Sequence, residues 1–262
     1  MNTYMDLKGK IALVTGAAQG IGAAVVKALA ELGVSVVAVD KNEEVLDRMA
    51  KNSQKNNQHV VVFQADVSDR KRIDKIVEEI ESTMGPIGIL VNVAGILRIG
   101  SVESLSDEDW HSTFEVNTTG VFYVSRAVIQ YMKPRKDGVI VTIGSNAASI
   151  PRVGMSAYAA SKAAVTSFTK TMALELAEYN IRCNIVSPGS TETEMQQKMW
   201  TDESDMEKVI KGSLENYKLG IPLKKLATPS DIAEAVLFLV SNRSAHITMH
   251  NMCVDGGATL GV

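Results

Sequence analysis

The stretch I-A-L-V-T-G-A-A-Q-G-I-G, residues 11–22, decides the fold of this chain. Its apolar start predicts a buried strand, and the alanine-rich residues 23–32 that follow have helical periodicity. Between strand and helix, Gly16 permits a tight turn, Gly20 lets the backbone approach a phosphate, and Gly22 allows close packing of the helix on the strand. Because a helix N-terminus attracts anions, this arrangement predicts a dinucleotide pyrophosphate site.

A carboxylate stands at the end of the next apolar run. Residues 34–39 predict a second buried strand, which ends at Asp40. A carboxylate there can accept hydrogen bonds from both hydroxyls of the adenosine ribose and repels a 2'-phosphate, so NAD is favoured over NADP. Lys41 weakens this preference, since a neighbouring cation offsets part of the repulsion. In the alternative interpretation, Asp40 is an acidic cap of a helix over residues 42–49.

Two further apolar runs end in residues that suit the same site. One run leads to Asp66 and Val67, and the other leads to N-V-A-G at residues 92–95. Ligands of open parallel sheets bind beyond the carboxyl ends of the strands, so both segments are expected near the glycine loop. The Asp66 carboxylate could meet an adenine amino group, or it could instead cap a helix that begins near Ser68.

Tyr158 and Lys162 lie one helical turn apart in Y-A-A-S-K. Residues at this spacing share one face of a helix, so the Lys162 ammonium can sit beside the Tyr158 phenol and favour its ionised form. A free phenol has a pKa of about 10, and each unit by which the pKa falls needs roughly 1.4 kcal/mol of preference for the phenolate. With Ser145 a short loop upstream, the pattern predicts a tyrosine base.

Together these motifs resemble the short-chain dehydrogenase/reductase family over nearly the whole chain. The features that carry the resemblance, in order, are T-G-x-x-x-G-x-G, N-x-A-G, a helical Asn117, Ser145, Tyr158-x-x-x-Lys162 and Pro188-Gly189. One position departs from the family pattern, since Val93 stands where a second asparagine is often found. The resemblance implies a single domain over residues 1–262, of class α/β, with a doubly wound parallel sheet (a Rossmann fold).

The resemblance also implies a catalytic tetrad. Tyr158 would be the acid/base, and Lys162 would bind the nicotinamide ribose and lower the pKa of the tyrosine. Ser145 would hydrogen-bond the substrate oxygen, while Asn117 would hold a water that links Lys162 to solvent. The residues expected around the cofactor, NAD, are Gly16, Gln19, Gly20, Ile21, Gly22, Asp40, Asp66, Val67, Asn92, Ala94, Gly95, Tyr158, Lys162, Pro188, Gly189 and Thr193.

Further stretches narrow the expected substrate. I-P-R-V-G-M-S-A-Y at 150–158 and K-L-G-I-P-L at 218–223 are among those similar to a subfamily that oxidises a cyclohexadiene diol carrying a carboxylate. Such a substrate needs a cation and otherwise apolar walls. Arg152 would hold the carboxylate bidentately, worth about 1.5 to 3 kcal/mol, and Arg98 is the second candidate. Either arginine could instead lie at the surface or in an interface.

The remaining substrate contacts come from the same subfamily segments. The residues expected around the substrate are Leu97, Arg98, Ile99, Ser145, Arg152, Gly154, Met195 and Gln196. Met195 could equally fill a gap in the core. The expected function is NAD-dependent oxidation of the diol to a catechol acid for siderophore biosynthesis, which leaves contact with siderophore synthase enzymes open. An oxidoreductase acting on a sugar or a 3-oxoacyl substrate would share every cofactor and tetrad residue, and a non-catalytic NAD sensor is a third alternative.

A lid and a subunit interface are also expected. Residues 194–219 mix methionines, Trp200 and many charges, which fits a mobile lid that excludes water, with a static amphipathic hairpin as the alternative. Two helices, about 107–132 and 156–179, carry apolar residues around much of their circumference, so we expect them to pack against another subunit. The resemblance implies a four-helix dimer interface there and a homotetramer, completed by the tail at 254–262.

Composition limits partners and location. A net charge of -3 gives no electrostatic reason to bind nucleic acid. The apolar runs are far shorter than the roughly 20 residues that span a bilayer, and the N-terminus lacks a hydrophobic signal core, so a cytoplasmic protein with no membrane association is expected. Cys183 and Cys253 lie outside any CxxC or histidine cluster, which predicts buried reduced thiols and no metal site.

Overall fold

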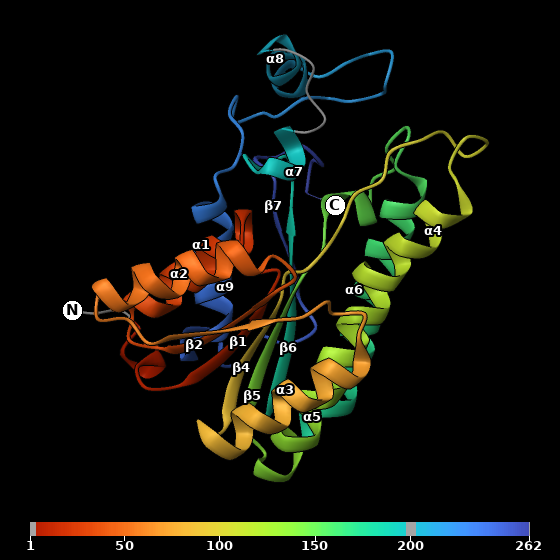
Figure 1. Cartoon of the computed structure of the whole chain (residues 1–262). Coiled ribbons are helices and arrows are strands. Elements are labelled where there is room, and N and C mark those ends of the chain that lie inside the picture. Colours follow the sequence, from red (N-terminus) through yellow and green to blue (C-terminus); the bar gives the residue numbers. More distant parts are fainter. Residues whose placement is uncertain (1–3, 198–202, 262) are drawn as a thin grey trace.

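The computed structural model describes residues 4–197 and 203–261, which build one sheet of seven parallel strands between two layers of helices (Figure 1). The strands are β1 (Ile11–Thr15), β2 (Ser35–Asp40), β3 (Val60–Gln64), β4 (Ile87–Asn92), β5 (Gly138–Ile143), β6 (Ile181–Pro188) and β7 (Asn251–Val254). Their order is β3-β2-β1-β4-β5-β6-β7, so the direction of winding reverses between β1 and β4. Open α/β sheets bind ligands at this switch point, and the predicted fold class is confirmed.

Helices cover both faces of the sheet. They are α1 (Gly20–Glu31), α2 (Glu43–Lys55), α3 (Arg70–Thr83), α4 (Asp107–Phe114), α5 (Val121–Arg135), α6 (Ser156–Leu176), α7 (Glu194–Gln197), α8 (Glu203–Lys211) and α9 (Pro229–Val240). Helices α1, α2 and α9 share one apolar core with the sheet, and α3, α5 and α6 share the other. Among the helices of the described ranges, none is long and apolar enough to cross a bilayer.

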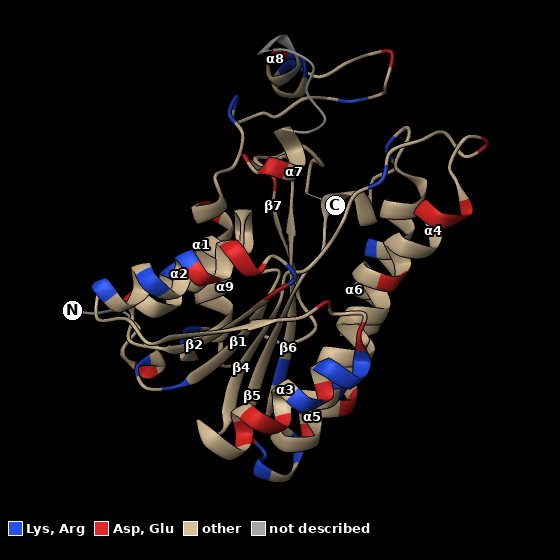
Figure 2. Cartoon of the chain, viewed as in Figure 1, with Lys and Arg blue, Asp and Glu red and all other residues tan. Residues whose placement is uncertain are grey.

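The central strands are apolar on both faces, because each face packs against helices. In β1, Ala12 and Val14 belong to the core under α1 and α9, while Leu13 between them belongs to the opposite core. A strand buried on both sides reads as a continuous apolar run instead of an alternating one. Charged residues therefore gather on helices and loops, and Figure 2 shows the sheet largely free of them.

The helix predicted at 107–132 contains an irregular turn. Between α4 and α5, Glu115–Gly120 forms a π-helical turn, and the helical segment continues to Arg135. A π turn inside an α-helix is often found at a functional site, and this one carries Asn117. The helix predicted at 156–179 is confirmed as α6, which a short 3₁₀ turn extends from Ala177 to Tyr179.

The carboxyl ends of the strands point toward the segments that lie at the top of Figure 1. There α7 and α8 lie beyond the strand ends of the sheet, with α8 farthest from it. The predicted lid at 194–219 thus starts above the expected cofactor site. Its residues 198–202, including Trp200, lie outside the described part of the chain.

Candidate active site

The glycine loop joins β1 to α1 and leaves no room for side chains at two of its glycines. A Cβ on Gly22 would lie 1.9 Å from the carbonyl oxygen of Gly16, and a Cβ on Gly16 would lie 2.7 Å from the backbone of Ala94. Gly22 thus lets the loop fold back on itself, a more local role than the helix packing that the sequence suggests. No side chain caps α1 at Gln19, so the N–H groups of its first turn, which includes Ile21, can bind a phosphate.

Asp40 ends β2 and connects it to the glycine loop. Its Oδ2 accepts a hydrogen bond from Ala18 N at 3.0 Å, and its Oδ1 accepts one from Asn42 N at 3.0 Å. The interpretation of Asp40 as a helix cap is wrong, because Asn42 caps α2 by accepting from Val45 N at 3.2 Å. Asp40 is therefore a partly buried carboxylate beside the glycine loop, while Lys41 is exposed.

Asp66 and Val67 follow β3. Asp66 Oδ1 accepts from the backbone N and the hydroxyl of Ser68, at 2.9 and 2.6 Å. The alternative role of Asp66 as a helix cap is wrong, because Asp69 caps α3 by accepting a backbone N–H at 3.1 Å. Val67 is buried, and a Cβ added to Gly120 of the π turn would lie 2.5 Å from its Cγ2. The Val67 side chain therefore packs the loop after β3 against the helical segment that carries Asn117.

The N-V-A-G segment at 92–95 packs directly on the glycine loop. Thr15 Oγ1 accepts from the two backbone N–H groups that follow Asn92, at 3.1 and 3.3 Å. The Asn92 side chain points into the core instead, where its Nδ2 donates to Ser125 Oγ at 3.1 Å. The sequence motifs assign no role to the Thr15 and Ser125 hydroxyls. For Thr15 a signal was available, since a hydroxyl at the end of a strand beside a glycine loop can bind backbone groups.

Ser145, Tyr158 and Lys162 meet beyond the carboxyl end of β5. The Ser145 hydroxyl accepts from Ala147 N at 3.1 Å and lies near enough to the Tyr158 phenol to act on its pKa. Lys162 is 4% exposed, and its Nζ lies 5.9 Å from the centre of the Tyr158 ring. The same Nζ donates to the carbonyl oxygen of Ile143 at 2.8 Å. A phenol thus lies between a hydroxyl and an ammonium, as the sequence predicts.

Burial acts on the pKa of both titrating groups. Burial raises the pKa of Tyr158, and the polar Ser145 hydroxyl acts in the opposite direction. Burial also lowers the pKa of Lys162 to about 8. The sequence predicts a lowered pKa for Tyr158, whereas its pKa is raised. In the protein alone, the cost of burying a charged phenolate exceeds the favourable effect of the neighbouring polar groups. A further positive charge beside the phenol is needed to reverse it, and an oxidised nicotinamide ring would carry one.

Asn117 is fully buried in the π turn. Its Oδ1 accepts from Ile96 N at 2.8 Å, and its Nδ2 donates to Ile96 O at 2.9 Å and to Ser161 Oγ at 3.0 Å. A Cβ on Gly95 would lie 3.3 Å from Asn117 Oδ1 and 3.5 Å from Lys162 Nζ, so Gly95 separates the two side chains. The water that Asn117 would hold stays a prediction. Such a water would bind the backbone carbonyl of Asn117, because both hydrogens of the Asn117 side-chain amide are already bonded.

The two candidate arginines differ in their partners. Arg98 Nε forms an ion pair with Asp109 Oδ1 at 3.0 Å, and its side chain is 49% exposed. Arg152 is partly buried, and its guanidinium makes no hydrogen bond or ion pair with any residue in the described ranges. Asp255 attracts it only at longer range. Arg152 is therefore the guanidinium that is free to bind a carboxylate.

The segments after β4 and η3 (Asn146–Ala148) pair at the expected substrate site. Gly100 N donates to Gly154 O at 3.0 Å, and Gly100 also bridges Met155. A Cβ on Gly154 would lie 3.4 Å from Ile99 Cγ2, so these two residues are neighbours. Ile99 is 56% exposed and Leu97 is partly buried, which leaves apolar surface for a ring.

Thr193 connects the start of the predicted lid to the glycine loop. Its Cγ2 would lie 3.2 Å from a Cβ on Gly20, and its hydroxyl accepts from Gln196 N at 3.3 Å. Met195 and Gln196 lie in α7 and are partly buried. Met195 is therefore not part of the core, in contrast to Met172, which is only 4% exposed. Whether the lid moves stays a prediction.

The turn after β6 is packed against the C-terminal segment. Gly189, which follows Pro188, donates its N–H to Val254 O at 3.0 Å, and a Cβ on Gly189 would lie 2.5 Å from the Cβ of Asp255. Asp255 also accepts a hydrogen bond from Asn146 Nδ2 at 3.3 Å, and Asn146 directly follows Ser145 in the chain. The sequence reasoning placed this tail in a subunit interface and missed Asp255, for which no local signal exists.

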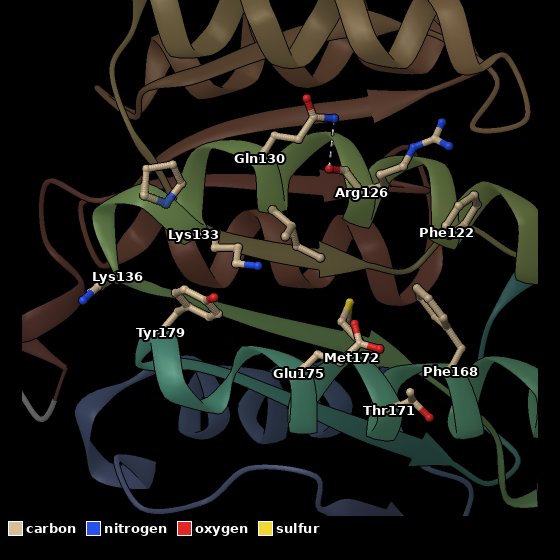
Figure 3. Close-up of a pocket in the computed structure, with 12 residues that line it drawn as sticks. Phe122, Arg126, Gln130, Lys133, Lys136, Phe168, Thr171, Met172, Glu175 and Tyr179 are labelled. Carbon is tan, nitrogen blue, oxygen red and sulfur yellow. Dashed lines mark hydrogen bonds between the residues drawn. The ribbon is translucent and has the colours of Figure 1, made fainter.

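A separate cavity of about 700 Å³ lies between α5 and α6, and Figure 3 shows the residues that line it. Phe122, Phe168, Met172 and Tyr179 contribute to its walls, and the Arg126 guanidinium lies 4.7 Å from the centre of the Phe122 ring. These two helices are the ones that the sequence predicts to contact another subunit. Their apolar residues thus line an open surface of the single chain.

The remaining candidate chemistry is easily placed. Within residues 4–197 and 203–261, no group of three or more histidine, cysteine or acidic side chains is arranged to hold a metal ion. Cys183 and Cys253 are free thiols. Cys183 is buried, which raises its pKa to about 12, whereas Cys253 is only partly buried.

A doubly wound parallel sheet with a glycine loop at its switch point, and a serine, a tyrosine and a lysine grouped beyond β5, define the class of dinucleotide-dependent oxidoreductases. Residues 10–204 match the model of the family described as short chain dehydrogenase. The chain therefore belongs to the short-chain dehydrogenase family, and the family predicted from its motifs is confirmed.

Relatives and solved structures agree with this family. The chain is 62% identical over 256 residues to a 2,3-dihydro-2,3-dihydroxybenzoate dehydrogenase of Bacillus subtilis (strain 168), covering 98% of each protein. It is 42% identical to the protein of the same name from Escherichia coli (strain K12), covering 98% of this chain and 100% of that one. A gluconate 5-dehydrogenase from Burkholderia cenocepacia J2315, in complex with NADP and tartrate, is 32% identical with a TM-score of 0.91, covering 100% of this chain and 99% of that one.

Proposed function

We propose that this chain oxidises 2,3-dihydro-2,3-dihydroxybenzoate to 2,3-dihydroxybenzoate, with NAD as the hydride acceptor, for siderophore biosynthesis. The observation that carries this proposal is the 62% identity to a dehydrogenase of that name over 98% of both proteins. The partly buried Arg152, which has no ion pair in the described part of the chain, supports it by offering a site for the substrate carboxylate.

The residues present fit a nicotinamide dinucleotide. The glycine loop leaves a cradle that a Cβ on Gly16 or Gly22 would fill, and the first turn of α1 has no side-chain cap. Asp40 at the end of β2 supports NAD over NADP, since its carboxylate would bind ribose hydroxyls and repel a 2'-phosphate. The fold alone does not fix this choice, because a solved relative with the same fold is in complex with NADP.

Tyr158 is the proposed acid/base. As a phenolate it takes the proton of the hydroxyl at ring position 3, and the hydrogen on that carbon leaves as a hydride. When bound, oxidised NAD would supply the hydride acceptor and, before the transfer, a positively charged ring beside the phenol. Lys162, 5.9 Å from the centre of the Tyr158 ring, favours the phenolate in the same direction. The buried tyrosine is therefore ionised, and available as a base, when the site is loaded.

Ser145 and Arg152 orient the substrate. The Ser145 hydroxyl, which lies near the Tyr158 phenol, would donate to the substrate oxygen as that oxygen becomes a carbonyl. Arg152 would hold the carboxylate at ring position 1, two bonds around the ring from the carbon that is oxidised. The immediate product is a ring ketone, which tautomerises to an aromatic catechol. The resonance energy gained in this step favours the overall oxidation.

Formation of NADH from the purified dihydrodiol acid tests the proposed function. A panel of sugars and 3-oxoacyl alcohols serves as the comparison, since a different short-chain oxidoreductase would share the tetrad. Efficient turnover of one of these alcohols, with no turnover of the dihydrodiol acid, would overturn the proposal.

The role of Arg152 has its own test. Arg152→Met should raise KM for the dihydrodiol acid about 10- to 100-fold, which corresponds to about 1.5 to 3 kcal/mol of lost charged hydrogen bonding. Turnover at saturation should change less. A neutral dihydrodiol without the carboxylate should bind the wild type poorly and lose little more in the variant. Arg98→Met is the matched control, because the Arg98 guanidinium is already paired with Asp109.

We further propose a cytoplasmic homotetramer with a mobile lid at 194–219. The apolar surface between α5 and α6, where Phe122 is 39% exposed, supports contact between subunits, and so does Leu174 elsewhere on α6, which is 67% exposed in the single chain. Light scattering on the purified protein should give four times the chain mass of 28.2 kDa, and a monomeric mass would contradict the proposal. Contact with siderophore synthase enzymes is a separate proposal, which co-purification tests.

A further inference from the structure

We propose that Lys218 is a second cation of the substrate carboxylate site and binds the same carboxylate as Arg152. This assignment rests on the proposed function, because it adds a binding residue for the same substrate. Lys218 lies in the loop at 212–220, between α8 and the segment that leads to α9. The sequence motifs alone indicate no ligand in this loop.

The loop is closed at its base, and Lys218 belongs to that base. Ser213 and Lys218 exchange two backbone hydrogen bonds, each of 2.9 Å. The backbones of Gly212 and Gly220 are so close that a Cβ on Gly212 would lie 2.7 Å from Gly220 N. The tip of the loop is exposed, with Leu214 at 96%, whereas Lys218 is partly buried. Lys218 is thus held by backbone contacts that the tip lacks.

The chain after this base is docked on the C-terminal turn that carries Asp255. Leu223 N donates to Gly256 O at 3.1 Å, and a Cβ on Gly256 would lie 2.7 Å from Ile221 Cγ2. Ile221 is only 6% exposed. Asp255 accepts from Asn146, which follows Ser145. The base of the loop, the C-terminal turn and the loop after β5 therefore form one packed unit beside the catalytic serine.

Two cations, Arg152 and Lys218, belong to this unit. Neither Arg152 nor Lys218 makes a side-chain hydrogen bond or ion pair in the part of the chain that is described. Burial lowers the pKa of Lys218, and the nearby charge of Arg152 lowers it further. Like charges in a partly buried site repel each other, so an anion bound between them removes an unfavourable interaction as well as adding favourable ones.

The charges of the unit match a substrate with one carboxylate. Asp255 acts electrostatically on Arg152, but it is already bonded by Gly257 N at 2.9 Å, Thr259 N at 3.0 Å, Thr259 Oγ1 at 2.8 Å and Asn146 Nδ2 at 3.3 Å. Burial raises the pKa of Asp255, yet these hydrogen bonds leave it lowered overall, so the group stays negative at neutral pH. Two cations and one carboxylate leave one positive charge, which a neutral sugar would not compensate.

Lys218→Met tests the assignment, with Lys211→Met as the matched control. Lys211 lies at the end of α8, is 72% exposed and pairs with Glu207 at 2.6 Å, so its loss changes the net charge equally without touching the site. Lys218→Met should raise KM for the dihydrodiol acid about 10-fold with turnover changed less than about 2-fold, the signature of lost binding. The neutral dihydrodiol should show no change, and Lys218→Arg should restore most of the affinity for the acid.

Equilibrium binding gives a readout that does not depend on turnover. Calorimetry on the protein loaded with NADH should show that Lys218→Met binds the product 2,3-dihydroxybenzoate about 10-fold more weakly, while catechol, which lacks the carboxylate, binds as it does to the wild type. Combined with Arg152→Met, the loss should be less than the product of the two single losses, because both cations bind one group.

Three outcomes would overturn the assignment. Unchanged affinity of Lys218→Met for the acid, with a loss in Arg152→Met, would leave Arg152 as the only cation of the site. Equal losses for the acid and for catechol would make Lys218 a structural residue of the lid. Equal affinity of the wild type for both compounds would show that no carboxylate site exists. Failure of the proposed function can be told apart from failure of the Lys218 assignment. In that case the wild type would bind 2,3-dihydroxybenzoate but would not oxidise the dihydrodiol acid.

Discussion

Replacing Lys162 with methionine should stabilise the protein at neutral pH while abolishing its activity. Burial lowers the pKa of Lys162 to about 8, from an ordinary value of about 10.4. This pKa difference corresponds to about 3 kcal/mol. It is the amount by which the buried, charged ammonium lowers the free energy of unfolding at pH 7. Methionine has no charge to bury, but it gives up the hydrogen bond to Ile143 O, worth about 1 to 2 kcal/mol. The variant should therefore be about 1 to 2 kcal/mol more stable at pH 7.

The pH dependence of this difference gives the sharper test. Because the folded state binds the lysine proton less tightly than the unfolded state, the wild type gains stability as the pH rises above about 8. From pH 7 to pH 9.5 this gain amounts to about 2 kcal/mol, whereas the variant has no such gain. The advantage of the variant should thus disappear near pH 9.5.

Urea unfolding followed by circular dichroism, without added cofactor, measures both quantities. Lys170→Met is the matched control, since Lys170 lies on the same helix α6 and is exposed. A Lys162→Met variant that is less stable than the wild type at pH 7, by an amount that does not vary up to pH 9.5, would refute the reasoning. The buried charge would then carry no cost in the folded state. Stability kept low by a functional group is a common feature of active sites.

Two further predictions concern the base and the coenzyme. Tyr158→Phe keeps the ring beside Ser145 but removes the proton acceptor, so turnover should fall about 100-fold or more. NAD binding, measured by fluorescence titration, should persist. Near-normal turnover would exclude the role of Tyr158. Asp40→Ala should weaken NAD binding and raise the ratio of kcat/KM for NADP to that for NAD, since it removes both the ribose acceptor and the repulsion of a 2'-phosphate. A wild type that already prefers NADP would contradict the role of Asp40.

The sequence by itself determined the architecture and the position of the glycine loop. Strands such as β1 are buried on both faces, so they appear as continuous apolar runs that need no tertiary information to be recognised. Gly16 and Gly22 have no room for a Cβ, and this local constraint is visible as a spacing of glycines. The turn between Tyr158 and Lys162 is equally local, because a helix places residues four apart on one face.

Only the tertiary structure decided which polar groups do which task. Whether Asp66 or Asp69 caps α3 depends on where the helix begins, and a shift of a few residues exchanges their roles. Asn92 ends a strand whose side chains alternate between the faces, so its amide points to Ser125 in the core. Neither outcome follows from the composition of the segment.

The site also depends on contacts between distant parts of the chain. Asn146 and Asp255 are 109 residues apart, and the order of β5, β6 and β7 in the sheet brings them together. Nothing near either residue in the sequence indicates that contact. The pKa of Tyr158 shows the same limit, since the sequence supplies the neighbouring lysine but not the burial that raises the pKa. Desolvation is set by the packing of the whole domain around a group, and so it is decided by the tertiary structure.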